Sequence, residues 1–182
     1  MSAGLSQEPC ELLRRLGAPE RLLLHAELVS EAAGELLTAM RSFGLQVNEE
    51  TVRLGAALHD AGKSVHPNEL DGQGKQHEED GEKLLLQAGV PAAIARCCVS
   101  HARYGAMEVS FEELLVALSD KLWKGKRDSP LELRVIDEAA KLLNKDRWDL
   151  FCELDNCFER IASQGSQRLA RNKARCETWA TR

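Results

Sequence analysis

The chain of 182 residues is long enough for one compact domain that buries a sizeable hydrophobic core. Hydrophobic residues make up 43% of it and charged residues 29%, a balance that excludes a disordered chain and a fibrous repeat. The formal net charge of -5 excludes an overall basic surface of the kind that attracts a nucleic-acid backbone. We therefore expect no stable nucleic-acid binding.

Six cysteines are present, including the adjacent Cys97 and Cys98, and no Cys-x-x-Cys motif occurs. Their apolar or helical contexts favour reduced, buried thiols over disulfides. The amino-terminal segment lacks a basic stretch followed by an apolar run, and no apolar stretch approaches the length of a membrane span. We expect a cytoplasmic protein that does not bind membranes.

The pattern along the chain predicts an all-α fold, because proline is sparse and helix-forming residues fill the stretches between glycines and prolines. The first predicted helix covers about residues 19–42 and carries His25 on its apolar stripe. A second helix ends in the dipeptide His59-Asp60, just before Gly62. A turn-rich loop then follows, of a kind that often forms a substrate entrance.

Three further helices are predicted after this loop. One places His77 on its inner face, and the next carries His101 at the end of an apolar stripe. The third begins at a capping box, in which Ser110 is followed three residues later by Glu113. Its apolar stripe includes Asp120, so a carboxylate is again expected to face the interior.

The rest of the chain is predicted as helices over about 131–143, 146–163 and 166–179, and it contributes no histidine. We expect residues 1–127 to form the helical core that holds the candidate site. Residues 128–182 are expected to form a helical extension packed on this core, within a single domain overall.

Histidines and aspartates thus recur on the inward faces of separate predicted helices, which is not typical core filling. Burial of several imidazoles and carboxylates is costly unless they are paired or bind a cation. Mixed nitrogen and oxygen ligands favour Fe, Mn, Co, Ni or Zn over an oxygen-only Mg site. We therefore expect one or two divalent transition-metal ions at the centre of the bundle. The residues that share this placement are His25, His59, Asp60, His77, His101 and Asp120.

The ordered set resembles the HD-domain metalloenzyme superfamily over roughly residues 20–127. Residues 58–63, Leu-His-Asp-Ala-Gly-Lys, are similar to the defining motif of that family, and residues 77–81, His-Glu-Glu-Asp-Gly, resemble the helix start that follows it. The resemblance implies an HD-domain-like helical bundle with the metal site at its centre. It also implies a minimum set of metal ligands, which here is His25, His59, Asp60 and Asp120. Binuclear members of the family add two histidines, which here are His77 and His101.

The same resemblance implies a metal-dependent phosphohydrolase that cleaves a phosphoester of a small molecule or nucleotide. We expect metal-bound hydroxide to attack phosphorus, since coordination lowers the pKa of water. Asp60 is the expected catalytic residue that orients or deprotonates this water, and Lys63 is expected to contact a phosphate oxygen or a bridging water. Lys121 and Lys124 are expected to bind the phosphate as well. Lys124 is equally explained as a cation that complements the dipole at the end of its helix.

Other classes stay open on these residues. A di-iron oxygenase of the same fold, acting on a phosphonate or polyol-like substrate, would use the same six ligands, although the lysines favour hydrolysis. A regulatory module that binds metal without turnover is disfavoured by the complete ligand set. Residues 100–105, Ser-His-Ala-Arg-Tyr-Gly, lack the His-His pair and the Gly-Tyr-Pro signature of the cyclic-dinucleotide phosphodiesterases. His66 lies in a polar loop and is left out of the ligand set, and neither substrate nor oligomeric state is predicted.

Overall fold

The computed structural model describes residues 8–71 and 74–180, and the regular elements of this part of the chain are helices, with no strand. This confirms the expected all-α fold. The elements in chain order are α1 (Pro9–Arg15), α2 (Glu20–Ser42), α3 (Glu49–Leu58), η1 (Ala61–Ser64), η2 (Pro67–Leu70), α4 (Gln76–Gln87), α5 (Ala92–Ala95), α6 (Cys97–Arg103), α7 (Phe111–Leu122), α8 (Ser129–Leu143), α9 (Arg147–Ser163) and α10 (Gly165–Ala180).

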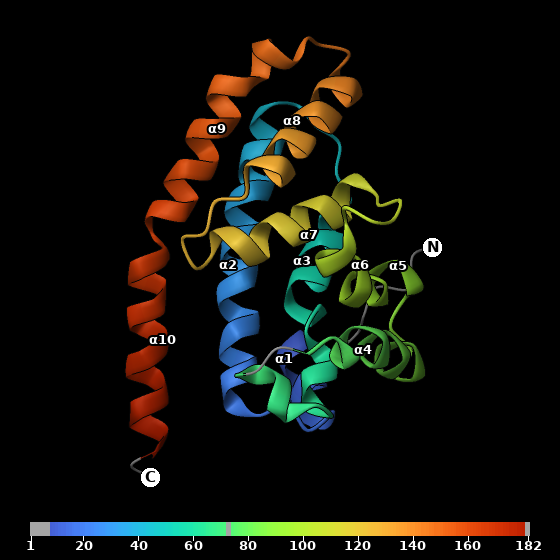
Figure 1. Cartoon of the computed structure of the whole chain (residues 1–182), viewed down its shortest axis with the longest axis vertical. Coiled ribbons are helices and arrows are strands. Elements are labelled where there is room, and N and C mark those ends of the chain that lie inside the picture. Colours follow the sequence, from blue (N-terminus) through green and yellow to red (C-terminus); the bar gives the residue numbers. More distant parts are fainter. Residues whose placement is uncertain (1–7, 72–73, 181–182) are drawn as a thin grey trace.

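Helix α2 is the central element of the arrangement. It is 23 residues long and contacts α1, α3, α7, α9 and α10. Figure 1 shows α7 crossing it and α10 running along its outer side. Because α3 packs against both α2 and α7, these three helices bring His25, His59 and Asp120 to one region. This packing positions one half of the candidate site.

The hydrophobic core consists of two clusters. The larger joins α2, α3 and α7 to the C-terminal helices α8 and α9, which contribute fully buried side chains such as Val135 and Phe158. The smaller joins α1, the ends of α2 and α3, and α4 to α6, with Leu13 and Leu85 fully buried. Helices α2 and α3 contribute to both clusters, so burial of apolar surface on either side fixes their placement.

Side chains at helix starts explain two of the boundaries. Asn48 accepts a hydrogen bond of 3.1 Å from the backbone nitrogen of Thr51 at the start of α3. Ser110 and Glu113 form the reciprocal capping box that the sequence predicts at the start of α7. These caps fix where the helices that carry His59 and Asp120 begin.

Some local features differ from the expected helices. The helix expected after Pro91 is broken at Arg96 into α5 and α6. At this break, Arg96 contacts Glu113 at 2.6 Å and the carbonyl oxygen of Glu108 at 2.6 Å, which ties the break to the start of α7. The short helix α1 was not expected, and the loop after Gly62 contains the 3-10 turns η1 and η2.

The C-terminal helices cover α2 on the side away from α4. Helix α9 leads directly into α10, which lies along α2 in Figure 1. The fully buried Arg168 of α10 pairs with Glu31 and Glu35 of α2. None of the helices in the described part of the chain combines the length and the hydropathy needed to cross a bilayer.

Candidate metal centre

The six expected ligand side chains meet in one place, although they come from separate elements. His25 lies on α2, His77 on α4 and His101 on α6. His59 and Asp60 follow the last residue of α3, and Asp120 lies on α7. All except the half-buried His25 are buried. Five elements of the bundle therefore converge on one polar centre in a mostly apolar interior.

Asp60 lies in the middle of the cluster, and its two oxygens face different histidines. Oδ2 lies 3.2 Å from Nε2 of His25 and 3.7 Å from Nε2 of His59. Oδ1 lies 3.4 Å from Nε2 of His77 and 3.8 Å from Nε2 of His101. This arrangement suits a carboxylate that is shared between two cations, one on each side.

Oδ1 of Asp60 is buried and has no hydrogen-bond partner among the described residues. A buried carboxylate oxygen without a partner costs free energy, so such an atom indicates a missing cation or water. The nitrogen atoms that face it are Nε2 of His77 at 3.4 Å and Nε2 of His101 at 3.8 Å, both of which can bind a metal ion. The donor set of the centre therefore fits a divalent metal ion.

Two overlapping groups of side chains have donor atoms within 4.8 Å of one another and could hold an ion. One group is His25, His59 and Asp120, in which Nε2 of His59 lies 3.7 Å from Oδ1 of Asp120. The other is His59, Asp60 and His101. Nitrogen and carboxylate donors together are typical of transition-metal sites.

The ring nitrogens that face away from the centre also have partners. Nδ1 of His59 lies 2.8 Å from the carbonyl oxygen of Ala56, and Nδ1 of His101 lies 3.0 Å from that of Cys97. A carbonyl oxygen only accepts, so each Nδ1 donates its hydrogen to it. When such a ring is neutral, it presents the lone pair of Nε2 to the centre, as a metal-ligating histidine does.

His77 is held differently, by a residue that the sequence analysis did not identify. Its Nδ1 lies 2.5 Å from Oε2 of the buried Glu69 in η2. Burial opposes ionisation of Glu69, but hydrogen bonds from the ring and backbone of His77 outweigh this effect and lower the pKa of the carboxyl group. A glutamate in a turn-rich loop gives no sequence signal of this contact, because the loop conformation decides where it points.

The pKa values of the carboxylates and of His101 suit cation binding, whereas the carboxylates, acting against burial, raise the pKa values of His59 and His77 in the metal-free protein. Burial opposes ionisation of Asp60, but the charge of His59 and the close contacts with the rings of His25 and His77 hold its pKa well below the ordinary value. The pKa of Asp120 is lowered against burial in the same way, by its hydrogen bond with His59. Burial and the charge of His59 lower the pKa of His101 to about 4. Near neutral pH the two carboxylates are therefore ionised and His101 is neutral, as metal ligation requires.

The glycine of the His-Asp-Ala-Gly-Lys segment allows the two halves of the centre to approach. A Cβ atom at Gly62 would lie 2.0 Å from the carbonyl oxygen of His77 and 2.7 Å from the backbone nitrogen of Gly81. The backbone of η1 thus lies directly against the first turns of α4, the element that carries His77. Only glycine fits at this contact.

The three lysines that the sequence analysis assigned to phosphate binding all lie beside the carboxylates of the centre. Nζ of Lys63 is 2.7 Å from Oδ2 of Asp60. Nζ of Lys121 and Nζ of Lys124 are each 3.5 Å from Oδ2 of Asp120. The remaining histidine, His66, lies outside the cluster and pairs with Asp80 at 2.8 Å.

A tryptophan and an ion pair complete the surroundings of the centre. The ring of Trp123 meets the ring of His25 edge-on, with 5.1 Å between the centroids. Arg103 binds the buried Glu78 at 2.6 Å, which joins α6 and α4 next to the histidines they carry.

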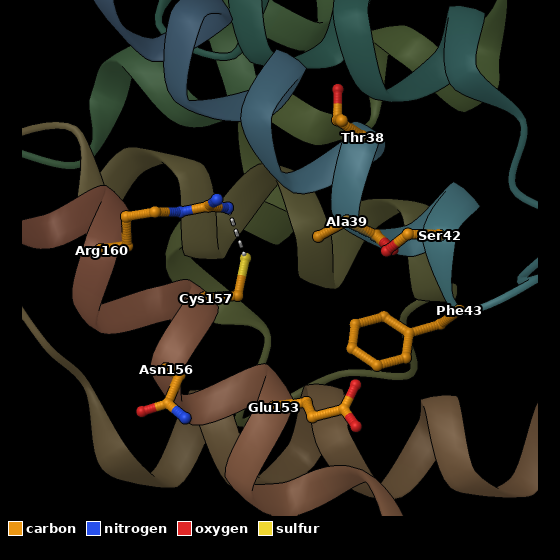
Figure 2. A pocket seen from close by; sticks show the side chains of 8 residues that line it. All are labelled: Thr38, Ala39, Ser42, Phe43, Glu153, Asn156, Cys157 and Arg160. Atoms are coloured by element: carbon orange, nitrogen blue, oxygen red, sulfur yellow. Dashed lines mark hydrogen bonds between the residues drawn. The ribbon is translucent and has the colours of Figure 1, made fainter.

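A separate crevice lies at the other end of α2, against α9, with a volume of about 440 Å³. Figure 2 shows the Arg160 guanidinium directed toward the thiol of Cys157, 3.6 Å away, while Phe43 closes the opposite side. The crevice contains none of the six candidate ligands and none of the three lysines. Its lining residues are Thr38, Ala39, Ser42, Phe43, Glu153, Asn156, Cys157 and Arg160.

Comparison with known proteins agrees with this geometry. A model of the HD-domain family matches residues 18–145, which include all six candidate ligands. An uncharacterized protein of the archaeon Methanocaldococcus jannaschii is 29% identical over 143 residues, covering 70% of this chain and 80% of the relative. No solved structure matches the chain. Since the family match spans most of the chain, the protein belongs to the HD-domain family, whose members bind divalent metals and are in general metal-dependent hydrolases.

Proposed function

We propose that this protein is a phosphohydrolase that cleaves a phosphoester bond in a small molecule or nucleotide. One observation carries the proposal: the ammonium groups of Lys63, Lys121 and Lys124 lie within 3.5 Å of the carboxylates of the candidate metal ligands. Cations beside a metal centre are suited to a phosphate group, which needs its negative charge neutralised in the transition state.

We assign the six side chains to two metal positions on either side of Asp60. The first position would be held by His25, His59, Asp120 and Oδ2 of Asp60. The second would be held by His77, His101 and Oδ1 of Asp60, the oxygen that has no hydrogen-bond partner in the described structure. The mixed donors suit Fe, Mn, Co, Ni or Zn.

Divalent ions bound there supply Lewis acidity and a water molecule that loses its proton near neutral pH. The protein contributes the placement of charges and of the substrate. Asp60 orients the attacking water through its carboxylate. Lys63, freed from Asp60 when cations neutralise that carboxylate, donates a hydrogen bond from Nζ to a phosphoryl oxygen. Lys121 and Lys124 hold the remaining phosphate charge.

The test combines metal analysis with a panel of substrates. The panel contains sugar phosphates, nucleoside monophosphates and dinucleoside polyphosphates, with released phosphate as the readout. Wild type is expected to contain up to two metal ions per chain and to release phosphate. His59→Ala and Asp60→Ala are expected to lose both properties, whereas the control His66→Ala, at the histidine paired with Asp80 outside the cluster, keeps them. Wild-type metal content and turnover in either site variant would overturn the assignment.

Other results would identify a different function of the same centre. Iron-dependent oxygen consumption without phosphate release would identify an oxygenase acting on a phosphonate or polyol-like substrate. Bound metal with neither activity would identify a regulatory module. We infer a cytoplasmic protein, because the five described cysteines are free thiols, as a reducing compartment keeps them.

A further inference from the structure

A buried carboxylate outside the proposed ligand set contacts only one of the ligand histidines. Glu69 in η2 is 6% exposed, and its Oε2 lies 2.5 Å from Nδ1 of His77. The same oxygen accepts a hydrogen bond of 3.1 Å from the backbone nitrogen of His77, and Oε1 accepts one of 3.3 Å from that of Gln76. The carboxylate thus holds both the ring of His77 and the first turn of α4.

This arrangement distinguishes His77 from its neighbours in the centre. The outer nitrogens of His59 and His101 bond to carbonyl oxygens three or four residues earlier in the chain. The ring of His77 depends on a side chain that arrives from another element, eight residues earlier in the sequence. A carboxylate bonded to the outer nitrogen fixes the orientation of an imidazole and increases its basicity as a ligand, more than a carbonyl group does.

The backbone around Glu69 leaves a space for its carboxylate. A Cβ atom at Gly74 would lie 2.2 Å from Cδ and 2.2 Å from Oε1 of Glu69. A side chain at position 74 would therefore displace the carboxylate from His77. The absence of a side chain at Gly74 and the burial of Glu69 are two separate features that serve the same contact.

We propose that Glu69 is a positioning residue that sets the metal affinity of the position shared by His77 and His101. The position of His25, His59 and Asp120 is expected to be independent of it, because no contact joins Glu69 to those residues in the described structure. The inference rests on the proposed metal centre. It gives the two metal positions different affinities and links one of them to the conformation of the loop that carries η2.

The alternative is that Glu69 only caps α4, since it accepts bonds from the backbone nitrogens of Gln76 and His77. Glu69→Gln keeps one oxygen that can still accept the hydrogen bonds from His77, while it removes the negative charge and replaces the other acceptor oxygen by an NH2 group. Asp71→Asn is the matched control: Asp71 lies in the same loop, pairs with Arg21 and is exposed. It removes the same charge without a contact to His77.

The experiment is a titration of metal-free protein with Mn²⁺, by equilibrium dialysis and by electron paramagnetic resonance, in which a coupled ion pair differs from a single ion. Wild type and Asp71→Asn are expected to bind two ions. Glu69→Gln is expected to bind the first ion unchanged and the second about 10- to 100-fold more weakly. Gly74→Ala, which displaces the carboxylate without altering it, is expected to weaken the second ion in the same way.

A double-mutant comparison separates positioning from capping. In His77→Ala, addition of Glu69→Gln is expected to have no further effect on Mn²⁺ binding, because Glu69 acts through His77. Unchanged binding of the second ion in Glu69→Gln would overturn the inference. So would a loss of Mn²⁺ affinity on adding Glu69→Gln to His77→Ala that equals the loss it causes in wild type. A wild type that binds a single ion would also overturn it while leaving the metal centre standing. A wild type that binds no Mn²⁺ or other divalent ion would instead refute the proposed centre itself.

Discussion

The ammonium nitrogen of Lys63 lies 2.7 Å from Oδ2 of Asp60, three residues earlier in the chain. Both side chains are largely buried, so this is a close contact of opposite charges beside the histidine cluster. A cation in this place balances the charge of Asp60 in the metal-free protein. In the proposed mechanism it becomes available to a phosphate group once metal ions take over that role.

The first prediction concerns this lysine. Lys63→Met is expected to lower kcat by about 100-fold or more, because a charged donor to the phosphoryl group is lost, while the metal content stays at the wild-type value. Steady-state kinetics and metal analysis of the same preparation measure the two effects. Lys83→Met is the control, since Lys83 is exposed and pairs with Asp80. Wild-type turnover in Lys63→Met would contradict the assigned role.

The second prediction concerns the contact between η1 and α4. Gly62→Ala would place a Cβ atom 2.0 Å from the carbonyl oxygen of His77, so the backbone must shift. We expect a loss of about 1–3 kcal/mol in the free energy of unfolding, as for other overpacked sites, and weaker binding of the second metal ion. Gly34→Ala is the control, since Gly34 lies inside α2 with open space around its Cβ position. This substitution is expected to increase the free energy of unfolding by about 0.5–1 kcal/mol. Denaturant unfolding measures both, and equal stability of the two variants would refute the packing argument.

The third prediction concerns the buried arginine of α10. Arg168 donates a hydrogen bond of 2.7 Å to the carbonyl oxygen of Ile161 and pairs with Glu31 and Glu35. Arg168→Leu leaves the carbonyl oxygen without its donor and is expected to cost about 1–3 kcal/mol, with a fall in Tm of about 2–4 °C for each kcal/mol. Arg171→Leu removes an exposed partner of Glu31 and is expected to cost under about 1 kcal/mol. Scanning calorimetry compares the two, and a Tm loss in Arg171→Leu as large as that in Arg168→Leu would contradict the argument.

The fourth prediction gives the pH dependence of the same contact. Burial opposes ionisation of Glu31, but hydrogen bonds from Arg171 and Arg168 outweigh it and lower the pKa of Glu31 below its ordinary value of 4.5. The stabilisation is therefore complete above that value and is lost as the pH falls below it. The Tm difference between wild type and Arg168→Leu is expected to shrink from about pH 6 to about pH 3. A difference that grows on acidification would contradict this sign.

The fifth prediction concerns thiol reactivity. Burial raises the pKa of Cys97 to about 12 and that of Cys98 well above the ordinary value, so both stay protonated at moderately alkaline pH. Because the thiolate is the reactive form, a short pulse of iodoacetamide is expected to modify the exposed Cys152 first. Peptide mass spectrometry with and without denaturant measures the order of labelling. Equal labelling of all three in the folded protein would be inconsistent with the buried positions.

The candidate site was largely predictable from the sequence, because its residues follow the helical period. His25 and Asp120 fall on the apolar stripes of long helices, so a hydrophobic pattern alone turns them inward. The placement of His59 and Asp60 follows from the end of α3 just before Gly62. These relationships depend on local geometry, which the spacing of residues along a helix determines.

Contacts that depend on loop conformation or on long-range packing could not be predicted. Glu69 lies in a polar loop where no period fixes its direction, and only the folded path of η2 brings it to His77. Arg168 lies in a polar, basic stretch that gives no signal of burial, yet it is fully buried, because it pairs with residues of α2 more than 130 positions away in the sequence. Arg127 follows Lys121 and Lys124 closely in the sequence, yet it binds acidic residues of α8 and α9.

Because Trp123 contacts His25 edge-on, its intrinsic fluorescence can report metal binding at the centre. The indole is buried beside the centre, whereas Trp148 is 69% exposed at the start of α9. Paramagnetic Mn²⁺, Fe²⁺ or Co²⁺ bound next to His25 would quench the emission of Trp123 but not that of Trp148. Dissolved iodide would quench the exposed Trp148 instead. With both Trp148 and Trp179 replaced by phenylalanine, Trp123 is the one tryptophan left, and the fall in fluorescence during a titration would follow the filling of the His25 side of the centre without any label.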